Sequence, residues 1–237
     1  MPHPAPARPA KGWIAALPRH RLMGEFSMWS ADLVNLAADT VRIGPFADML
    51  HIDVADGHFA PALLFFPDLV ARIRALTAVP IHVHLMCADA VLLSQIEQFA
   101  ESGADLISIH AENANADAAL AVIKGLGLAA GMVLRVETPV AQVAPWLGRL
   151  DCLTLLGTAI GVKGQGLDPT APDRLRQAGT MIAGTGRRIV LAADGGIRDN
   201  TVPLLLAAGA ETVVLGSLAF GAPDLAERMR WLHGLQA

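Results

Sequence analysis

An apolar segment of the chain ends with the sequence His51-Ile52-Asp53-Val54-Ala55-Asp56-Gly57. Alternate side chains of a β-strand point to the same face, so His51 and Asp53 would project together while Ile52 and Val54 face the other way. An imidazole and a carboxylate two residues apart at the carboxyl end of a strand form half of a metal site. A polar strand end that faces water would fit the pair alone equally well, so the surrounding sequence decides between the two.

The segments around this strand repeat one pattern, in which a short β-rich run is followed by a longer amphipathic segment. The runs predicted as strands are residues 22–29, 47–54, 80–86, 105–110, 129–135, 151–157, 188–194 and 212–216. The segments predicted as helices are residues 31–43, 67–77, 89–102, 115–126, 139–147, 171–183, 198–208 and 222–235. Strict alternation of eight strands with eight helices is typical of a closed parallel barrel. The sequence therefore predicts an α/β protein with a single (β/α)8 barrel.

The composition is that of a globular protein with a large core. The chain has 237 residues, of which 53% are hydrophobic, and its mean hydropathy is +0.45. A formal net charge of −4 without a polybasic patch argues against nucleic acid as a partner, and the apolar runs are too short to span a bilayer. Cys87 and Cys152 lack the spacing of a disulfide framework, which favours a reduced, cytoplasmic location.

The first residues differ in composition from the rest of the chain. Residues 1–9 are rich in Pro and Ala, and the apolar piece at 13–17 is interrupted at Pro18. That piece is too short for a transmembrane helix and makes a poor signal peptide. We expect residues 1–20 to be a flexible N-terminal extension and residues 21–237 to form the catalytic barrel, without a second domain.

Polar side chains recur at the carboxyl ends of the predicted strands, where the active sites of such barrels form. A lone histidine on a strand is more often structural than a ligand, but here two His and two Asp converge on one barrel mouth. His82 shares a face with His84, which lies nearer the strand end and is the better ligand candidate. The four side chains that would form a mixed nitrogen and oxygen site for Zn, Mn, Fe or Co are His51, Asp53, His84 and Asp194.

Two glycine-rich turns follow the last two predicted strands, at Asp194-Gly195-Gly196-Ile197 and Leu215-Gly216-Ser217-Leu218. Backbone N–H groups exposed at such turns bind anions, and the loops after the seventh and eighth strands are the usual phosphate site of this fold. Ordinary turn chemistry is the alternative explanation. A metal, two carboxylates and a phosphate site together predict epimerisation of a small phosphorylated sugar. One of Asp53 and Asp194 would remove a proton next to a carbonyl and the other would return it to the opposite face of the enediolate, whose charge the metal would stabilise.

The ordered motifs resemble the ribulose-phosphate 3-epimerase family from about Phe26 to Phe220. The resemblance is carried by residues 27–32, 51–59, 83–86, 193–196 and 216–217. It implies a TIM barrel of the ribulose-phosphate-binding type and one divalent metal ion (Zn, Fe, Mn or Co) held by His51, Asp53, His84 and Asp194. It also implies Asp53 and Asp194 as the acid/base pair. The implied partners are a small phosphorylated ketose and further copies of the chain in a homo-oligomer, with neither nucleic acid nor a membrane.

The resemblance also implies roles for residues around the metal ligands. Ser30 would contact substrate oxygens, Met86 would line the site, and Gly164 and Gln165 would belong to a mobile loop over it. The residues that would hold the phosphate are Gly195, Gly196, Gly216 and Ser217.

Several residues expected in the walls of the site depart from the family pattern. Ala55 and Leu156 stand where the family has methionines, and Ala62 stands where it has Asn. Residues 159–165 read Ala-Ile-Gly-Val-Lys-Gly-Gln in place of Asn-Pro-Gly-Phe-Gly-Gly-Gln, and Arg135-Val136 replaces an Asn-Pro. Arg135 and Lys163 are added cations, which either form a solvated rim or, with Arg135 as a substrate-binding residue, meet an extra anionic group.

The leading hypothesis is a metal-dependent epimerase that inverts C3 of a ketose phosphate, by default D-ribulose 5-phosphate to D-xylulose 5-phosphate. A paralogue with altered substrate, such as allulose 6-phosphate or a tetrulose phosphate, would also keep the catalytic residues and change the walls. A non-catalytic sugar-phosphate-binding barrel is disfavoured, because a binding module needs neither both aspartates nor two ligand histidines. A barrel decarboxylase is disfavoured because Asp53 is followed by Val54-Ala55-Asp56, without the lysine of an Asp-x-Lys-x-x-Asp motif.

Overall fold

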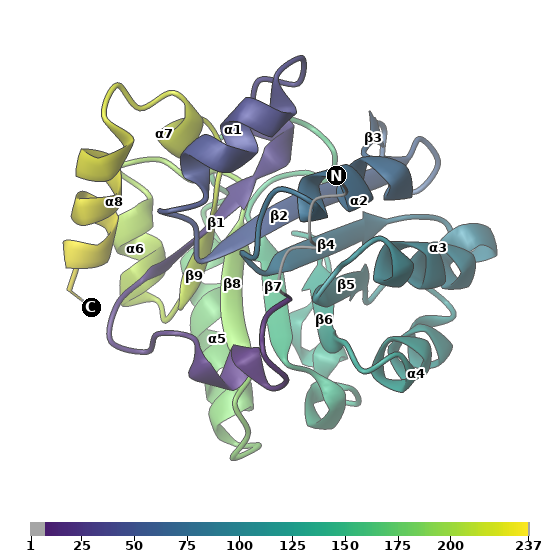
Figure 1. Cartoon of the computed structure of the whole chain (residues 1–237). Coiled ribbons are helices and arrows are strands. Elements are labelled where there is room, and N and C mark those ends of the chain that lie inside the picture. Colours follow the sequence, from purple (N-terminus) through teal and green to yellow (C-terminus); the bar gives the residue numbers. More distant parts are fainter. Residues whose placement is uncertain (1–7, 237) are drawn as a thin grey trace.

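The computed structural model describes residues 8–236 and contains a closed barrel of eight parallel strands (Figure 1). The barrel closes because β1 pairs in parallel with both β2 and β9. A two-residue strand, β3 (Leu63–Leu64), pairs antiparallel with the carboxyl end of β2. The barrel strands are β1 (Met23–Ser27), β2 (Met49–Asp56), β4 (Ile81–Met86), β5 (Leu106–His110), β6 (Ala129–Leu134), β7 (Cys152–Leu156), β8 (Val190–Asp194) and β9 (Thr212–Leu215). The predicted (β/α)8 barrel is therefore confirmed.

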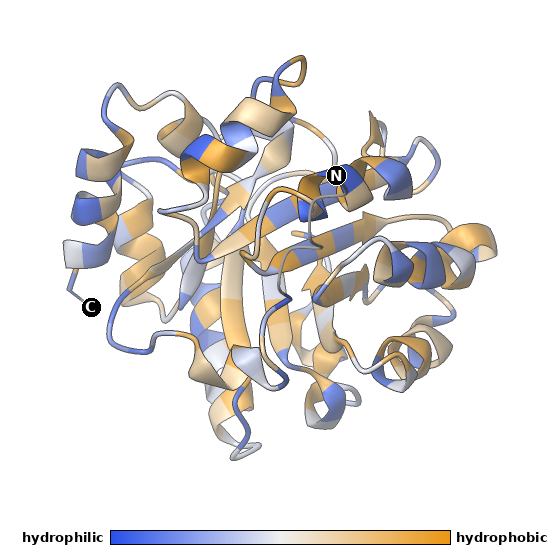
Figure 2. Ribbon diagram, in the orientation of Figure 1, coloured by the Kyte–Doolittle hydropathy of each residue, from blue (hydrophilic) through white to orange (hydrophobic). Residues whose placement is uncertain are grey.

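Helices surround the barrel and present mixed polar and apolar surfaces, whereas the strands are largely hydrophobic (Figure 2). The helices are α1 (Leu36–Ile43), α2 (Pro67–Arg74), α3 (Asp89–Glu101), α4 (Ala116–Gly125), α5 (Ala171–Ala183), α6 (Val202–Ala207), α7 (Ser217–Phe220) and α8 (Leu225–Gly234). Within residues 8–236 the structure contains no helix with the length and apolarity needed to cross a membrane.

The connection between β6 and β7 differs from its prediction. In place of a helix at 139–147, the structure has two 3-10 turns, η3 (Val140–Val143) and η4 (Leu147–Arg149). Proline lacks the backbone N–H of an α-helical hydrogen bond and clashes with the preceding turn. Pro145 is the seventh of the nine residues of the predicted segment and explains why the amphipathic pattern does not become an α-helix.

The strands divide their side chains between two cores. Outward-facing residues such as Phe26, Ile52 and Val83 pack in the main hydrophobic cluster with residues of the helices. The inward-facing residues form layers, as in other barrels of this kind. The lowest layer, here called the barrel floor, is apolar and consists of Met23, Met49, Leu106, Cys152, Val190 and Ala192. Strand alternation places a polar layer above it, fully buried, consisting of Glu25, His51, His82, Ser108, Thr154 and Thr212.

The N-terminal segment closes the barrel floor from outside. Residues Trp13–Ala16 form a 3-10 turn, η1, and Trp13, Ile14 and Leu17 pack against the floor. The expectation of a flexible extension over 1–20 does not hold for these residues, because the floor offers apolar surface that the short apolar piece covers. Residues 1–7 of the expected extension lie outside the described residues.

A candidate active site at the mouth of the barrel

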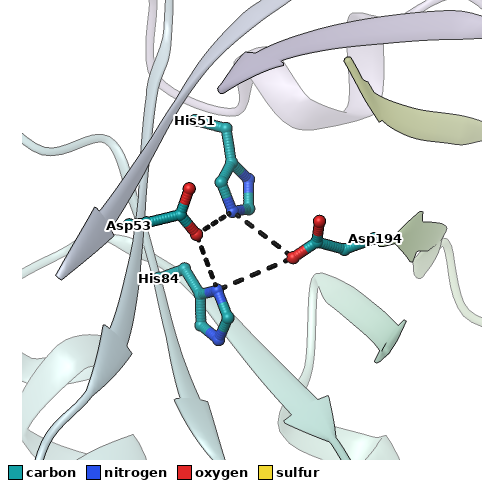
Figure 3. A group of neighbouring side chains, drawn as sticks. All are labelled: His51, Asp53, His84 and Asp194. Atoms are coloured by element: carbon teal, nitrogen blue, oxygen red, sulfur yellow. Dashed lines mark hydrogen bonds and ion pairs between the residues drawn. The ribbon is translucent and has the colours of Figure 1, made fainter. Parts of the chain in front are cut away.

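Four predicted ligands meet at the carboxyl ends of three strands (Figure 3). His51 and Asp53 lie on β2, His84 lies on β4 opposite Asp53 in the strand register, and Asp194 ends β8. Asp53 Oδ1 is 3.3 Å from both His51 Nε2 and His84 Nδ1. Asp194 Oδ2 is 3.9 Å from His51 Nε2 and 3.8 Å from His84 Nδ1. One nitrogen or oxygen atom from each of the four residues thus lies around a common point.

These four residues fit a divalent metal ion. Their candidate ligand atoms all lie within 4.8 Å of one another, and ligand atoms around a tetrahedral ion bound at 2.0–2.2 Å are about 3.4 Å apart. His51 Nε2 is buried, points into the cluster and makes no hydrogen bond to any residue of the described chain. Its nearest polar atoms are carboxylate oxygens of Asp53 and Asp194 at 3.3 and 3.9 Å, and a cation between these atoms would satisfy all of them. Two imidazoles and two carboxylates are also a suitable donor set for Zn, Mn, Fe or Co.

The charges of the cluster support the same interpretation. Burial by itself would lower the pKa of His51, but the Asp53 and Glu25 carboxylates outweigh burial and raise it well above its usual range. Among residues 8–236, the ion pairs of Asp53, Asp194 and Glu25 involve histidines and neither Lys nor Arg. A cluster that draws a proton onto a buried imidazole lacks positive charge, which a divalent cation would supply.

The two carboxylates differ in their affinity for a proton. Burial would raise the pKa of Asp53, but His51 and His84 outweigh burial and lower it, so Asp53 is ionised. Burial raises the pKa of Asp194 to about 6, with a further contribution from the negative charge of Asp53. Two neighbouring carboxyl groups with opposed proton affinities are suited to an acid/base pair.

Two neighbours that the sequence analysis did not assign to the site orient its members. Ser27, on β1, donates a hydrogen bond from Oγ to Asp53 Oδ2 at 2.8 Å and is itself buried. His110, on β5, lies with its Nε2 2.8 Å from His84 Nε2, and its Nδ1 is 3.0 Å from Glu112 Oε2. Both residues sit at strand ends, so position along the strand was the available signal.

A buried carboxylate lies beneath His51 in the polar layer. Glu25 Oε2 is 3.0 Å from His51 Nδ1 and 2.7 Å from His82 Nδ1, and Glu25 and both histidines are fully buried. His82 Nε2 is 2.6 Å from Ser108 Oγ. Burial would raise the pKa of Glu25, but His82 and His51 lower it strongly, so the carboxylate is ionised. Glu25 was not among the residues predicted for the site, although a glutamate inside an apolar strand is a signal of a buried polar role.

A cavity of about 600 Å³ opens above the four ligands. Asp53, His84 and Asp194 line it, while His51 lies fully buried behind them. The remaining predicted site residues that line the same cavity are Ser30, Met86, Gly164, Gln165, Gly195, Gly196, Gly216 and Ser217. The structure thus brings together all the predicted site residues except Arg135.

The predicted phosphate-binding glycines occupy positions that exclude a side chain. Gly195 and Gly196 have φ of 90° and 71°, a left-handed region that favours glycine. A Cβ at Gly196 would lie 2.7 Å from Leu167 Cα, and one at Gly216 would lie 2.9 Å from Ser30 Oγ. The backbone of these turns therefore borders the cavity directly, as an anion site built from N–H groups requires.

The two added cations have different surroundings. The Arg135 guanidinium lies 4.2 Å from the centre of the Phe59 ring and donates to Phe59 O at 3.0 Å, and Arg135 does not border the cavity. Lys163 does line it, donates to Trp29 O at 2.6 Å, and lies 4.5 Å from the Trp29 ring centre. Arg135 thus holds the loop that carries Phe59, and of the two added cations only Lys163 borders the cavity, which Arg198 also lines.

The chain is similar to proteins of known activity along most of its length. Residues 25–220 match the model of a family described as the ribulose-phosphate 3 epimerase family. The chain is 37% identical over 204 residues to ribulose-phosphate 3-epimerase 2 of Cupriavidus necator, covering 84% of each chain. It is 35% identical over 202 residues to the ribulose-phosphate 3-epimerase of Escherichia coli (strain K12), covering 84% of this chain and 88% of that one. A crystal structure of orotidine 5'-phosphate decarboxylase from Pyrococcus horikoshii OT3 has a TM-score of 0.64 at 14% identity, covers 89% of this chain and 97% of its own, and supports the fold alone.

Proposed function

The chain belongs to the ribulose-phosphate 3-epimerase family, and from this premise we propose that it inverts C3 of a ketose phosphate in a metal-dependent, two-base reaction. The default substrate is D-ribulose 5-phosphate, with D-xylulose 5-phosphate as the product. The observation that carries the proposal is the pair Asp53 and Asp194, which face one cavity with opposed proton affinities beside two histidines.

Proton transfer follows from the states of the two carboxyl groups. The ionised Asp53 carboxylate accepts the proton of the carbon next to the substrate carbonyl, and Ser27 Oγ holds this carboxylate through its other oxygen at 2.8 Å. Asp194 donates a proton to the opposite face of the resulting enediolate, and its burial, which raises the pKa of its carboxyl group, favours the protonated form that this step needs. In the reverse reaction the two residues exchange roles.

His51, Asp53, His84 and Asp194 would hold the metal ion. When bound there, a divalent ion supplies the positive charge that stabilises negative charge on the substrate oxygens. The backbone at Gly195, Gly196, Gly216 and Ser217 borders the same cavity and would bind the phosphate through N–H groups. The Gly164–Gln165 segment and Ser30 border the substrate cavity on other sides.

The substrate choice depends on walls that depart from the family pattern. Ala55 is buried in an apolar cluster with Ala60 and Met86, and Leu156 lines the cavity. Ala55 does not border the cavity itself but packs against Met86, which does, so the substitution would act on the cavity through Met86; allulose 6-phosphate is one alternative substrate. A tetrulose phosphate, whose phosphate lies one carbon nearer to C3, is the other alternative substrate.

Solvent isotope exchange tests the proposal. The purified protein, loaded with each candidate metal, is incubated with D-ribulose 5-phosphate in D₂O, and deuterium at C3 is followed by NMR. We expect incorporation at C3 for the wild type and loss of the D-xylulose 5-phosphate product in Asp194→Asn, because this variant cannot donate a proton to the opposite face. Exchange in another ketose phosphate alone would identify the alternative substrate. Binding of ketose phosphates without exchange in any of them would mean a non-catalytic sugar-phosphate-binding barrel.

Two further expectations stay predictions. A cytoplasmic location is supported by Cys87 and Cys152, which are buried free thiols without a disulfide between them. A homo-oligomer is supported by the family resemblance, and sedimentation of the purified protein would test it.

A further inference from the structure

We propose that Glu25 is a positioning residue for the metal centre, which fixes the ring of His51 so that its Nε2 lone pair faces the ion. The inference rests on the proposed function only in that the site must bind a metal. It concerns a residue of the polar layer that does not border the substrate cavity.

The geometry leaves His51 only one way to serve as a ligand. Its Nδ1 lies 3.0 Å from Glu25 Oε2, and both side chains are fully buried. An ionised carboxylate only accepts hydrogen bonds, so Nδ1 must carry the hydrogen and donate it. A neutral imidazole protonated at Nδ1 has its lone pair at Nε2, and His51 Nε2 is the atom that points at Asp53 and Asp194 without a hydrogen bond within the described chain. Glu25 thereby sets both the tautomer and the ring orientation of His51.

The position of Glu25 is fixed in turn by a chain of contacts across the barrel. Glu25 Oε2 also accepts a hydrogen bond from His82 Nδ1 at 2.7 Å, and His82 Nε2 is 2.6 Å from Ser108 Oγ. Ser108 has room for its hydroxyl because its strand partner is Gly131, where a Cβ would lie 1.9 Å from Ser108 Oγ. Residues of five neighbouring strands, β1, β2, β4, β5 and β6, therefore cooperate to hold one metal-ligand histidine.

A carboxylate behind a ligand histidine also affects the strength of the metal bond. Such a carboxylate makes the histidine more basic, and its loss typically weakens metal binding by about 10- to 100-fold. Glu25 adds one negative charge in a fully buried position where water does not screen it. We therefore expect the affinity for the metal, and not only the rate of the reaction, to depend on Glu25.

A second metal ion on Glu25, His51 and His82 is the competing interpretation of the same residues, whose ligand atoms also lie close together. The distances from Glu25 Oε2 to the two Nδ1 atoms, 3.0 and 2.7 Å, are hydrogen-bond lengths. A metal at this point would have to displace both hydrogens. The other nitrogen of His82 is already paired with Ser108, so we favour hydrogen bonds over a second ion.

Cobalt titration tests the proposal. Metal-free wild type and Glu25→Gln are titrated with Co²⁺ in competition with a chelator of known affinity, and the visible absorption of the bound Co²⁺ is recorded. We expect one Co²⁺ per chain in both proteins, with about 10- to 100-fold weaker binding and an altered absorption spectrum in the variant. The carbonyl oxygen of the glutamine can still accept from both imidazoles, as Glu25 Oε2 does, so the substitution removes the negative charge behind His51 and keeps the size of the side chain. Circular dichroism establishes that the metal-free variant is folded.

Thr212→Val is the matched control. Thr212 is fully buried in the same layer, and its hydroxyl makes no hydrogen bond to the rest of residues 8–236. We expect its Co²⁺ affinity and spectrum to stay within about twofold of wild type, since valine keeps the shape of threonine. A general effect of changing the barrel interior would show itself as weaker binding in this control and would overturn the proposal.

The remaining outcomes separate the inference from the proposed function. Equal affinity and spectra in wild type and Glu25→Gln would overturn the inference alone, as would a second Co²⁺ per chain that the variant loses. A wild type that binds no Co²⁺ would overturn the metal-dependent function and the inference together. If Glu25→Gln does not fold, His82→Asn is the variant that tests the proposal. It removes the imidazole that donates the second hydrogen bond to Glu25, and we expect it to weaken Co²⁺ binding several-fold. Wild-type affinity in that variant would overturn the proposal.

Discussion

Replacing Gly131 by alanine should disrupt the hydrogen-bonded layer under the active site. A Cβ at this position would lie 1.9 Å from Ser108 Oγ and 3.0 Å from Ser108 Cβ. Atoms do not approach so closely, so the Ser108 hydroxyl has to rotate out of its present place. In doing so it leaves His82 Nε2, which lies 2.6 Å from it and is fully buried.

The expected loss of stability is the sum of two effects. Forcing an extra methyl group into a packed interior costs about 1–3 kcal/mol. Leaving the buried imidazole nitrogen of His82 without its partner costs about 1–3 kcal/mol more. The free energy of unfolding should therefore fall by about 2–6 kcal/mol, which for a domain of this size lowers Tm by roughly 5–20 °C.

Urea unfolding followed by circular dichroism measures this loss. Ser108→Ala should cost only the hydrogen bond, about 1–3 kcal/mol, and Gly131→Ala combined with Ser108→Gly should be less destabilised than the two single effects added together. Gly125→Ala is the control, because it lies in α4 and its Cβ would meet no atom within 4 Å of the described chain. A Gly131→Ala protein within about 1 kcal/mol of wild type, below the overpacking range, would refute the steric argument.

Three further predictions concern other parts of the chain. Burial and the nearby Asp56 raise the pKa of Cys87 to about 12, so the native thiol should resist a disulfide reagent at pH 8 and react only after unfolding; fast native labelling would contradict this. Burial would raise the pKa of Glu112, but hydrogen bonds from His110 and Thr138 lower it from 4.5 to about 2. Its stabilisation is therefore present above pH 4.5 and is lost as the pH falls toward 2, and Glu112→Gln should reduce the unfolding free energy by about 2 kcal/mol more at pH 6 than at pH 3. Arg135→Ala should lower the unfolding free energy by about 1–2 kcal/mol through its lost contacts with Phe59 while leaving KM unchanged; a tenfold higher KM at equal stability would restore Arg135 as a substrate-binding residue.

Periodicity and strand-end chemistry were enough to predict the barrel and the convergence of two histidines and two aspartates at its mouth. Parallel strands end at one edge of a barrel, so His51, Asp53, His84 and Asp194 had to converge once each was assigned to a strand end. The orienting residues were harder to predict, because their roles depend on the register between strands. His82 looked like a weaker ligand candidate on the same face as His84, but the register places it one layer lower, beside Glu25.

The local sequence predicts the structure least well where a proline or a contact distant in the sequence determines the conformation. The amphipathic pattern at 139–147 resembles a helix, yet Pro145 prevents one and 3-10 turns form. Arg135 follows a strand, and its position in the sequence predicts that it faces the mouth. In the structure its guanidinium lies over the ring of Phe59, which is distant in the sequence. The residues next to Arg135 in the sequence do not indicate a contact with a residue so distant from it.

The apolar segment under the barrel has a consequence for the order in which the chain folds. Trp13, Ile14 and Leu17 are synthesised before all the strands of the barrel, but their partners on the floor extend to Val190 and Ala192 on β8. The segment therefore cannot complete its contacts until most of the protein has left the ribosome, and it docks only on a floor that is already assembled. Because contacts so distant in sequence form late, the fluorescence of Trp13, in a variant that keeps it as the only one of the four tryptophans, should report the docking of this segment onto the assembled floor.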